Sequence, residues 1–245
     1  MACEAAIEKG KRVEKMKLHV TACVIVAATL LESGFCMLSS KAEASPTTIV
    51  ALGDSLIAGY GLPEGDSFPA QLETALKAKG HDVAVVNAGV SGDTAAAGLK
   101  RLDWALPENA DAVIIELGGN DALQGVPPAQ TKASLTKIIT QVQARGLPIL
   151  LAGMESPRNM GKAYTEEFRA VFADLAKEYD LVFYPFFLEG AALTDGMMQG
   201  DGIHANANGV KTIVAGILPK VEELLAKVDE KAGKPEATAA EPPAP

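Results

Sequence analysis

A serine directly follows the first strand-like stretch of the chain. The residues IVALGDSLIAGYG, 49–61, place Ser55 right after a run with the composition of a buried strand. A serine hydroxyl is a candidate nucleophile for acyl transfer if a neighbouring base can take its proton. The G-x-S-x-G elbow of the common α/β hydrolases is absent, because no glycine stands two residues after Ser55. A nucleophile at this position must therefore be held in a different way.

Two later strand-like stretches also end in small and polar residues. The segment NAGVSGDT contains Gly92, and the segment ELGGND contains Asn120. The N–H group of a glycine can approach a ligand closely, and with a side-chain amide it offers a tetrahedral oxyanion uncharged donors. Each loop taken alone is more typical of a tight turn than of an oxyanion site. Three such loops at three successive strand ends favour an acyl-transfer site.

Three histidines are available as a general base. His19 lies in the N-terminal region and His81 in a polar turn, whereas His204 lies in GDGIHANANG just ahead of the last helix. Asp201 precedes His204 by three residues, so its carboxylate can reach the imidazole, fix its tautomer and stabilise the imidazolium. A helix cap beside a surface histidine has the same pattern. The nucleophile and donors already identified favour a Ser-His-Asp triad.

Apolar runs and helical periodicities alternate between these segments. Strand-like runs cover 48–53, 83–89, 112–118, 148–154 and 181–187. Most are almost continuously apolar, as in parallel strands buried on both faces. Helical spacing separates them, with a weaker helix over 93–106 and a last helix that Pro219 should kink. This alternation predicts a parallel sheet covered on both faces, and the order 2-1-3-4-5 would bring the three polar loops to one edge.

The segments GDSLIAGYG, NAGVSGDT, LGGND and DGIH resemble, in order and spacing, the SGNH (GDSL-type) hydrolases. The likeness covers about 48–225 and is greatest to the bacterial periplasmic arylesterase and thioesterase I/lysophospholipase L1 branch. It implies a flavodoxin-like three-layer α/β/α sandwich with a five-stranded parallel sheet of order 2-1-3-4-5. It also implies the roles of the site residues: Ser55 is the nucleophile, His204 the base and Asp201 its orienting acid, and the oxyanion hole consists of the Ser55 and Gly92 N–H groups with the Asn120 amide.

The expected function is that of a serine esterase with an acyl-enzyme intermediate. Its expected substrates are small to medium acyl (aryl) esters, with acyl-thioesters and lysophospholipids as further classes. Several apolar residues near the site are candidates for the acyl pocket, and core or lid packing is the alternative for each: Leu123, Val126, Met154, Phe187, Met197 and its neighbour Met198. The segment GVPPAQT, 125–131, is a candidate lid.

Three other functions fit parts of the pattern. A carbohydrate O-acetylesterase would use the same site. A metallophosphoesterase would also place GD and GND at strand ends, but it needs several histidines, and His19 falls in the predicted signal. A non-enzymatic binding protein on a flavodoxin-like fold would not need Ser55, Asp201 and His204 together. We therefore expect a carboxylic ester hydrolase with no metal site and no cofactor.

The N-terminal segment has the pattern of an export signal. Basic residues precede the apolar run 18–31, and Ala42-Glu43-Ala44 has the form of a cleavage site. This predicts a signal peptide over 1–44, cut after Ala44, with Met16 as an alternative start. The protein should then be periplasmic or secreted, without stable membrane insertion, because the run is short for a bilayer span. All three cysteines lie within 1–44, so the exported domain should fold without disulfides.

The C-terminal segment and the overall charge complete the expected organisation. Residues 229–245 are rich in Pro, Ala and Glu, and this composition predicts a disordered tail. The hydrolase domain is therefore expected to cover 45–228. The net charge of −9 argues against a nucleic-acid surface, which needs clustered Lys and Arg. The expected partner is a small-molecule ester.

Overall fold

The structure is a computed structural model that describes residues 45–233. The predicted signal peptide with its cleavage site, the three cysteines and residues 234–245 lie outside the described residues. No helix within 45–233 is long and apolar enough to cross a membrane. The predictions about export and the tail therefore remain predictions.

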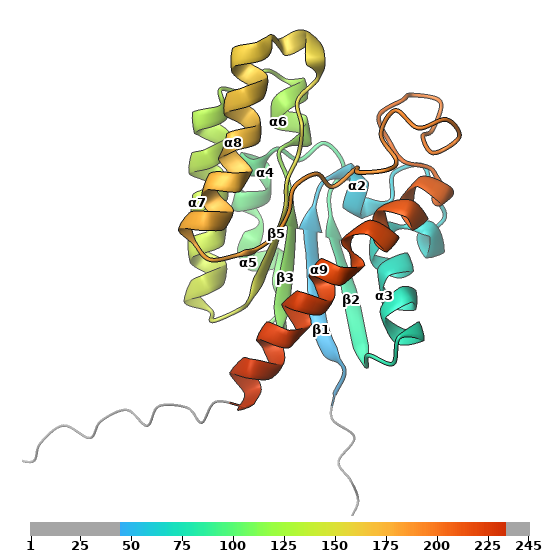
Figure 1. Cartoon of the computed structure of the whole chain (residues 1–245). Helices are drawn as coiled ribbons and strands as arrows, with labels where there is room; N and C mark the ends of the chain where they lie inside the picture. Colours follow the sequence, from blue (N-terminus) through green and yellow to red (C-terminus); the bar gives the residue numbers. More distant parts are fainter. Residues whose placement is uncertain (1–44, 234–245) are drawn as a thin grey trace, which may run out of the picture. The chain divides into compact units, whose positions relative to one another are not determined.

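Five parallel strands form the sheet in the order β2-β1-β3-β4-β5, which confirms the predicted topology (Figure 1). The strands are β1 (Thr47–Gly53), β2 (Val83–Gly89), β3 (Ala112–Glu116), β4 (Ile149–Ala152) and β5 (Val182–Tyr184). The last three end earlier than the apolar runs that predicted them. Leu117, Met154 and Phe187 follow these strands and are buried outside the sheet. An apolar run indicates which residues are buried and not which residues pair in a sheet. It therefore overestimates the length of a strand when the residues after the strand are also buried.

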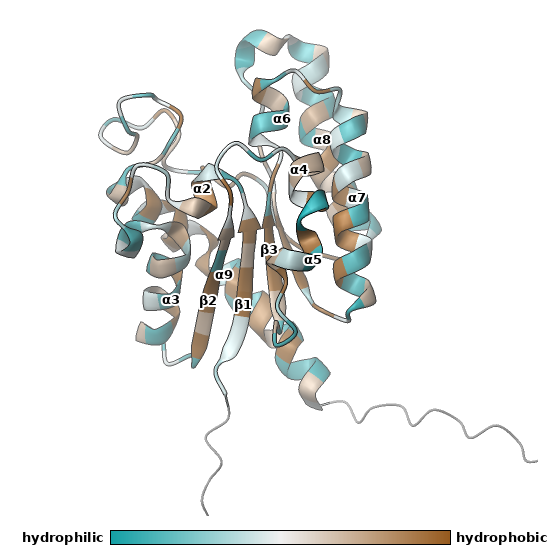
Figure 2. Ribbon diagram, turned by 180° about the vertical axis from the view of Figure 1, so that it is seen from behind, coloured by the Kyte–Doolittle hydropathy of each residue, from teal (hydrophilic) through white to brown (hydrophobic). Residues whose placement is uncertain are grey.

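Helices cover both faces of the sheet, as in a three-layer sandwich (Figures 1 and 2). Helices α3 (Phe68–Ala78) and α9 (Ala207–Gly233) pack together on one face. Helices α4 (Ala95–Lys100), α7 (Pro128–Ala144) and α8 (Lys162–Glu178) pack side by side on the other. Each long helix buries the apolar stripe that its sequence spacing predicts, as Phe168, Phe172 and Leu175 do on α8.

Short helices follow three of the strands on the edge that carries the site. They are α2 (Ser55–Ala58) after β1, α4 and α5 (Leu102–Ala105) after β2, and α6 (Gly119–Leu123) after β3. The single weak helix predicted over 93–106 is wrong, because Arg101 separates α4 from α5. The Arg101 guanidinium donates hydrogen bonds to the carbonyls of Ala88 and Gly53, at 2.9 Å each. Helical spacing could not predict this break, because it accompanies contacts with the ends of β1 and β2.

The last helix continues through Pro219 as one element. Proline has no N–H for the carbonyl four residues earlier, but Ala215 is exposed and its carbonyl can bind water. The helix also runs past the predicted domain end at 228 and extends to Gly233, the last described residue. Extending a helix costs less than starting one, and Glu230, Lys231 and Ala232 are favourable helix residues. Residues 229–233 are therefore helical rather than part of the tail.

Candidate active site

The Asp54 side chain holds the turn that presents Ser55. Ser55 is the first residue of α2 and lies directly after β1. Asp54 caps this helix, and its Oδ1 accepts a hydrogen bond of 2.9 Å from the N–H of Leu56. A side-chain oxygen at this position satisfies a donor that the first helical turn leaves free. The serine is thus held by a capped one-turn helix instead of a glycine elbow.

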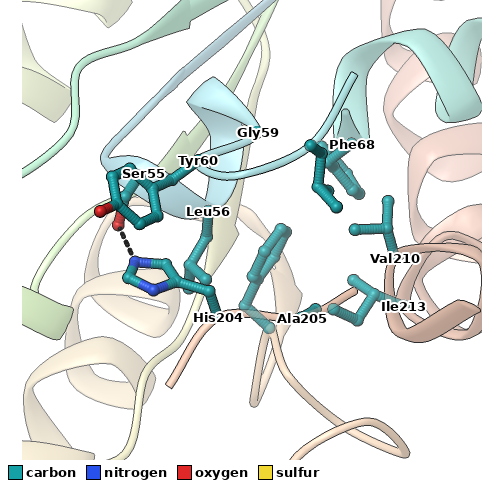
Figure 3. A pocket seen from close by; sticks show the side chains of 11 residues that line it. Ser55, Leu56, Gly59, Tyr60, Phe68, His204, Ala205, Val210 and Ile213 are labelled. Atoms are coloured by element: carbon teal, nitrogen blue, oxygen red, sulfur yellow. Dashed lines mark hydrogen bonds between the residues drawn. The ribbon is translucent and has the colours of Figure 1, made fainter. Parts of the chain in front are cut away.

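A continuous hydrogen-bonded chain joins Ser55, His204 and Asp201. The Ser55 Oγ lies 2.9 Å from the His204 Nε2 (Figure 3). The other ring nitrogen, Nδ1, lies 2.7 Å from the Asp201 Oδ2. Two elements that are far apart in the sequence, α2 and the loop before α9, supply these groups. The arrangement can take a proton from the serine hydroxyl onto an oriented imidazole.

The Asp201 carboxylate is fixed by its own loop. Its Oδ1 accepts hydrogen bonds from the backbone N–H groups of Ile203, at 2.9 Å, and His204, at 3.0 Å. The hydrogen bond with the His204 ring and these two backbone donors hold the pKa of Asp201 well below its usual range. The Asp201 carboxylate is therefore ionised in the folded protein at neutral pH.

Two residues that the sequence did not single out support His204. The Tyr60 ring packs against the imidazole with ring centroids 4.7 Å apart (Figure 3). Gln199 donates hydrogen bonds from Nε2 to the carbonyl oxygens of Tyr60, at 2.8 Å, and Ala205, at 3.0 Å. Gln199 thus ties the loop after α2 to the loop that carries His204. No local pattern distinguishes either residue, because both contacts join segments about 140 positions apart.

The two remaining candidate donors, Gly92 and Asn120, lie in the loops after β2 and β3. Gly92 has a φ of +88°, a backbone conformation that favours glycine. The Asn120 Nδ2 donates to the Asp54 Oδ2, at 2.9 Å, and to the Asp93 carbonyl, at 3.0 Å. Both hydrogens of the amide are therefore bound. To accept a hydrogen bond from Asn120, an oxyanion must share the amide hydrogen that is bound to the Asp93 carbonyl, or displace that carbonyl as its acceptor.

A buried acid pair underlies these loops. Asp54 is 2% exposed and Glu116, the last residue of β3, is 0% exposed. Burial raises the pKa of Asp54 to about 6, against the opposing effects of the Leu56 N–H, His204 and Asn120. Burial first, and the neighbouring Asp54 charge second, raise the pKa of Glu116 well above its ordinary value. No sequence pattern indicated a role for either carboxyl group.

A cavity of about 520 Å³ opens beside Ser55, Asn120 and His204. Of the candidate acyl-pocket residues, Leu123 and Met154 line this cavity. Met198, the neighbour of Met197 and also a candidate, lines it as well. The other apolar wall residues, which no sequence pattern indicated, are Leu56, Pro157, Phe186, Leu188, Ala192, Leu193 and Ile203. Glu155, Arg158 and Glu189 add charge to the lining.

The other three candidates lie elsewhere. Phe187 is 1% exposed, packs edge-on against Phe68 with ring centroids 4.9 Å apart, and lines a much smaller pocket that Ser55 also lines. Met197 packs against the core beside α9, where the Thr212 hydroxyl approaches its sulfur. Val126 is half-buried and does not line the cavity. Its carbonyl accepts a hydrogen bond of 2.8 Å from the Tyr164 hydroxyl.

The candidate lid segment 125–131 is tied down in the structure. Besides the Tyr164 contact to Val126, the Thr131 hydroxyl donates to the buried Asp121 Oδ1 at 3.0 Å. Asp121 also accepts the N–H of Ala95 at 2.8 Å, so the aspartate of GGND joins the starts of α4 and α7. Asp121 therefore has a structural role in this fold, although an aspartate at the end of a strand is also typical of a metal-binding loop. Within 45–233, no three His, Cys, Asp or Glu side chains are grouped to hold a metal ion.

Fold and site together have the arrangement of an α/β serine hydrolase, and comparison with known proteins identifies the family. The model of the GDSL-like lipase/acylhydrolase family matches residues 51–211. The esterase TesA of Pseudomonas aeruginosa is 41% identical over 178 residues, which are 72% of this chain and 89% of that protein. The thioesterase 1/protease 1/lysophospholipase L1 of Escherichia coli K12 is 41% identical over 173 residues, 70% of this chain and 82% of that protein.

Solved structures agree. The crystal structure of AlinE4, an SGNH-hydrolase family esterase, superposes with a TM-score of 0.63 and 44% sequence identity, over 74% of this chain and 98% of that one. The chain belongs to the GDSL-like lipase/acylhydrolase family, the SGNH hydrolases, and is a carboxylic ester hydrolase.

Proposed function

We propose that the protein is a serine esterase in which Ser55 is the nucleophile, His204 the general base and Asp201 the residue that orients it. The observation that carries this proposal is the unbroken chain from the Ser55 Oγ to the His204 Nε2, at 2.9 Å, and from Nδ1 to the Asp201 carboxylate, at 2.7 Å. These separations are within the range of a nucleophile and base ready for proton transfer.

The reaction follows from the geometry in two stages. As the Ser55 oxygen attacks the ester carbonyl, His204 takes its proton and Asp201 stabilises the imidazolium that forms. The imidazolium then returns the proton to the leaving alcohol, which departs and leaves an acyl group on Ser55. Water, activated by the same imidazole, hydrolyses this acyl-enzyme and restores the hydroxyl.

Developing charge on the carbonyl oxygen needs donors on the opposite side from His204. The proposed donors are the N–H groups of Ser55 and Gly92 and the amide of Asn120. Ser55 begins a helix, so its N–H has no acceptor within that helix. The Val90 N–H donates to the Gly53 carbonyl at 3.0 Å, and this bond ties the Gly92 loop to the strand end that precedes Ser55.

The cavity supports small to medium acyl esters as the substrate class. Its volume of about 520 Å³ is that of a small-molecule site, and apolar side chains form most of the wall beyond Ser55. Leu123 and Met154, with Phe186 and Met198, are the proposed acyl contacts. The names of the relatives, esterase and thioesterase 1/lysophospholipase L1, support thioesters and lysophospholipids as further substrates.

A fluorophosphonate probe tests the mechanism, because it reacts covalently with an activated serine. Wild-type protein should be labelled once, on Ser55, and Ser55→Ala should lose both labelling and turnover while it stays folded. Ser67, which is also buried but donates to the Glu64 carbonyl, gives a matched Ser67→Ala control that should keep labelling. Labelling at another residue would refute the proposal. A panel of p-nitrophenyl esters of increasing chain length, acyl-CoA, lysophospholipid and acetylated sugar would then define the substrate.

We also infer that the protein is exported and cut after Ala44. The basic residues, the apolar run 18–31 and the small residues at the proposed site support this. N-terminal sequencing of protein recovered from the periplasm or medium should start at Ser45. A sequence that starts at Met1 or Met16 would contradict cleavage.

A further inference from the structure

Glu116 lies directly beneath the turn that carries Ser55. It is the residue of β3 that pairs with Gly53 of β1. A Cβ atom on Gly53 would lie 2.7 Å from the Glu116 Oε2 and 2.6 Å from the Glu116 carbonyl oxygen, so only glycine lets the two strand ends approach this closely. The Glu116 Oε2 accepts a long hydrogen bond, 3.4 Å, from the N–H of Asp54. The Glu116 Oε1 is buried with no hydrogen-bond donor among the described residues.

The neighbouring Asp54 carboxylate is much better supplied with donors. The N–H of Leu56 reaches its Oδ1 and the amide of Asn120 reaches its Oδ2, each at 2.9 Å. The charged and titratable groups around the pair are His204 from the loop before α9, and Arg101 and Asp93 from the segment around α4. Arg101 directs its guanidinium to the Gly53 and Ala88 carbonyls and to Asp93, so it does not neutralise either buried acid.

Two buried carboxyl groups this close, with no cation bound to either among the described residues, are expected to hold one proton between them. Ionising both would bury two like charges, and that costs more than protein donors of this kind offset. Asp54 has the donors that stabilise an anion, whereas Glu116 has one long bond and one unpartnered oxygen. Glu116, the side chain with fewer donors, is therefore the better place for the shared proton.

We propose that Glu116 is a positioning residue for the catalytic loops: as a neutral carboxylic acid it donates to Asp54, which in turn holds the Asn120 amide and the first turn of α2. The proton on Glu116 thus fixes the Asp54 carboxylate, and Asp54 in turn positions Ser55 and the Asn120 amide. The kinetic part of this inference rests on the proposed function, whereas the location of the proton does not.

Two substitutions of similar size distinguish the role of Glu116 as a hydrogen-bond donor from its role in filling space. Glu116→Gln keeps a neutral donor to Asp54, and Glu116→Met keeps the length of the side chain but removes the donor. With a p-nitrophenyl ester, Glu116→Gln should retain kcat within about threefold, which is less than the loss of one good hydrogen bond would cause. Glu116→Met should lower kcat by roughly 10- to 100-fold with little change in KM, because a displacement of about 1 Å in a catalytic group has effects of this size.

Infrared spectroscopy locates the proton without reference to activity. At neutral pH the wild type should show the C=O stretching band of a protonated carboxylic acid, and Glu116→Gln should lack it. Absence of the band in the wild type overturns the proposal, as does a folded Glu116→Gln variant that is as inactive as Glu116→Met, or a fully active Glu116→Met. If Glu116→Met does not fold, the band and the activity of Glu116→Gln decide the matter. Failure of the Ser55 labelling with the band present would refute the proposed function alone.

Discussion

Asp54 uses the two oxygens of one carboxylate for two different parts of the site. Its Oδ1 caps the helix that starts at Ser55, and its Oδ2 accepts from the Asn120 amide. The side chain is almost fully buried, so neither bond competes freely with water. Asp54, which lies between Gly53 and Ser55, thus orients both the proposed nucleophile and a proposed oxyanion donor.

Asn120 provides the sharpest test at the scale of single residues. Asn120→Ala removes one donor to the developing oxyanion, so kcat should fall on the order of 10²–10³ while KM changes much less. The exposed Asn208 at the start of α9 offers a matched Asn208→Ala control, which should keep wild-type kinetics. Steady-state kinetics on a soluble aryl ester measures both constants. A raised KM with unchanged kcat would instead make Asn120 a substrate-binding residue.

At the scale of elements, two arginines bind pairs of backbone carbonyls at opposite ends of the molecule. Arg101, between α4 and α5, donates to the carbonyls of Gly53 and Ala88 at the site end of the sheet. Arg145, which follows α7, donates to the carbonyls of Leu106 and Pro107 at the far end. Both guanidinium groups hold backbone carbonyls, but of these two arginines only Arg101 holds strand ends that lead into the proposed catalytic loops.

Comparing substitutions at the two arginines separates an effect on stability from an effect on catalysis. Arg101→Met and Arg145→Met each leave carbonyls without their donors, so each should lower the free energy of unfolding by about 1–3 kcal/mol. Only Arg101→Met should also lower kcat, by roughly tenfold or more, because the ends of β1 and β2 set the positions of Ser55 and Gly92. Urea unfolding and steady-state kinetics measure the two effects. Equal losses of kcat in both variants would show that Arg101 has no special role in the site.

At the scale of the whole molecule, the site lowers the stability of the fold that holds it. Glu116 has a folded-state pKa well above its ordinary value of 4.5, because it is buried beside Asp54. Above about pH 4.5 the unfolded chain releases this proton and the folded protein keeps it. The folded state then binds more protons than the unfolded state, so the free energy of unfolding falls as the pH rises toward the folded pKa.

Glu116→Gln removes this titration, and the change should be visible in thermal unfolding. Near pH 4.5 the variant and the wild type should have similar Tm values. As the pH rises to neutrality the variant should become the more stable protein by at least about 2–4 °C, the shift that 1 kcal/mol produces in a domain of this size. Calorimetry of both proteins across this range tests the expectation. A Tm difference that does not change with pH would contradict a raised pKa for Glu116.

The sequence alone determined the elements and the chemical groups, because both leave local signals. Buried parallel strands are apolar runs, and helices have a 3.6-residue spacing, so all five strands were predictable. The order 2-1-3-4-5, which the structure confirms, was implied by the resemblance of four segments to the SGNH hydrolases. Ser55, Asn120 and His204 stood in short polar segments after apolar runs or ahead of a helix. The structure brings these three residues to one cavity.

Tertiary structure decided which apolar residues line the cavity and which polar residues support the site. Phe187 and Met197 face the core, whereas their neighbours Phe186 and Met198 line the cavity. Adjacent residues point in different directions, so composition near a strand end cannot distinguish a cavity wall from core packing. The contacts of Glu116, Arg101 and Tyr60 join segments that are distant in sequence. Such contacts exist only once the sheet is assembled, and no local pattern records them.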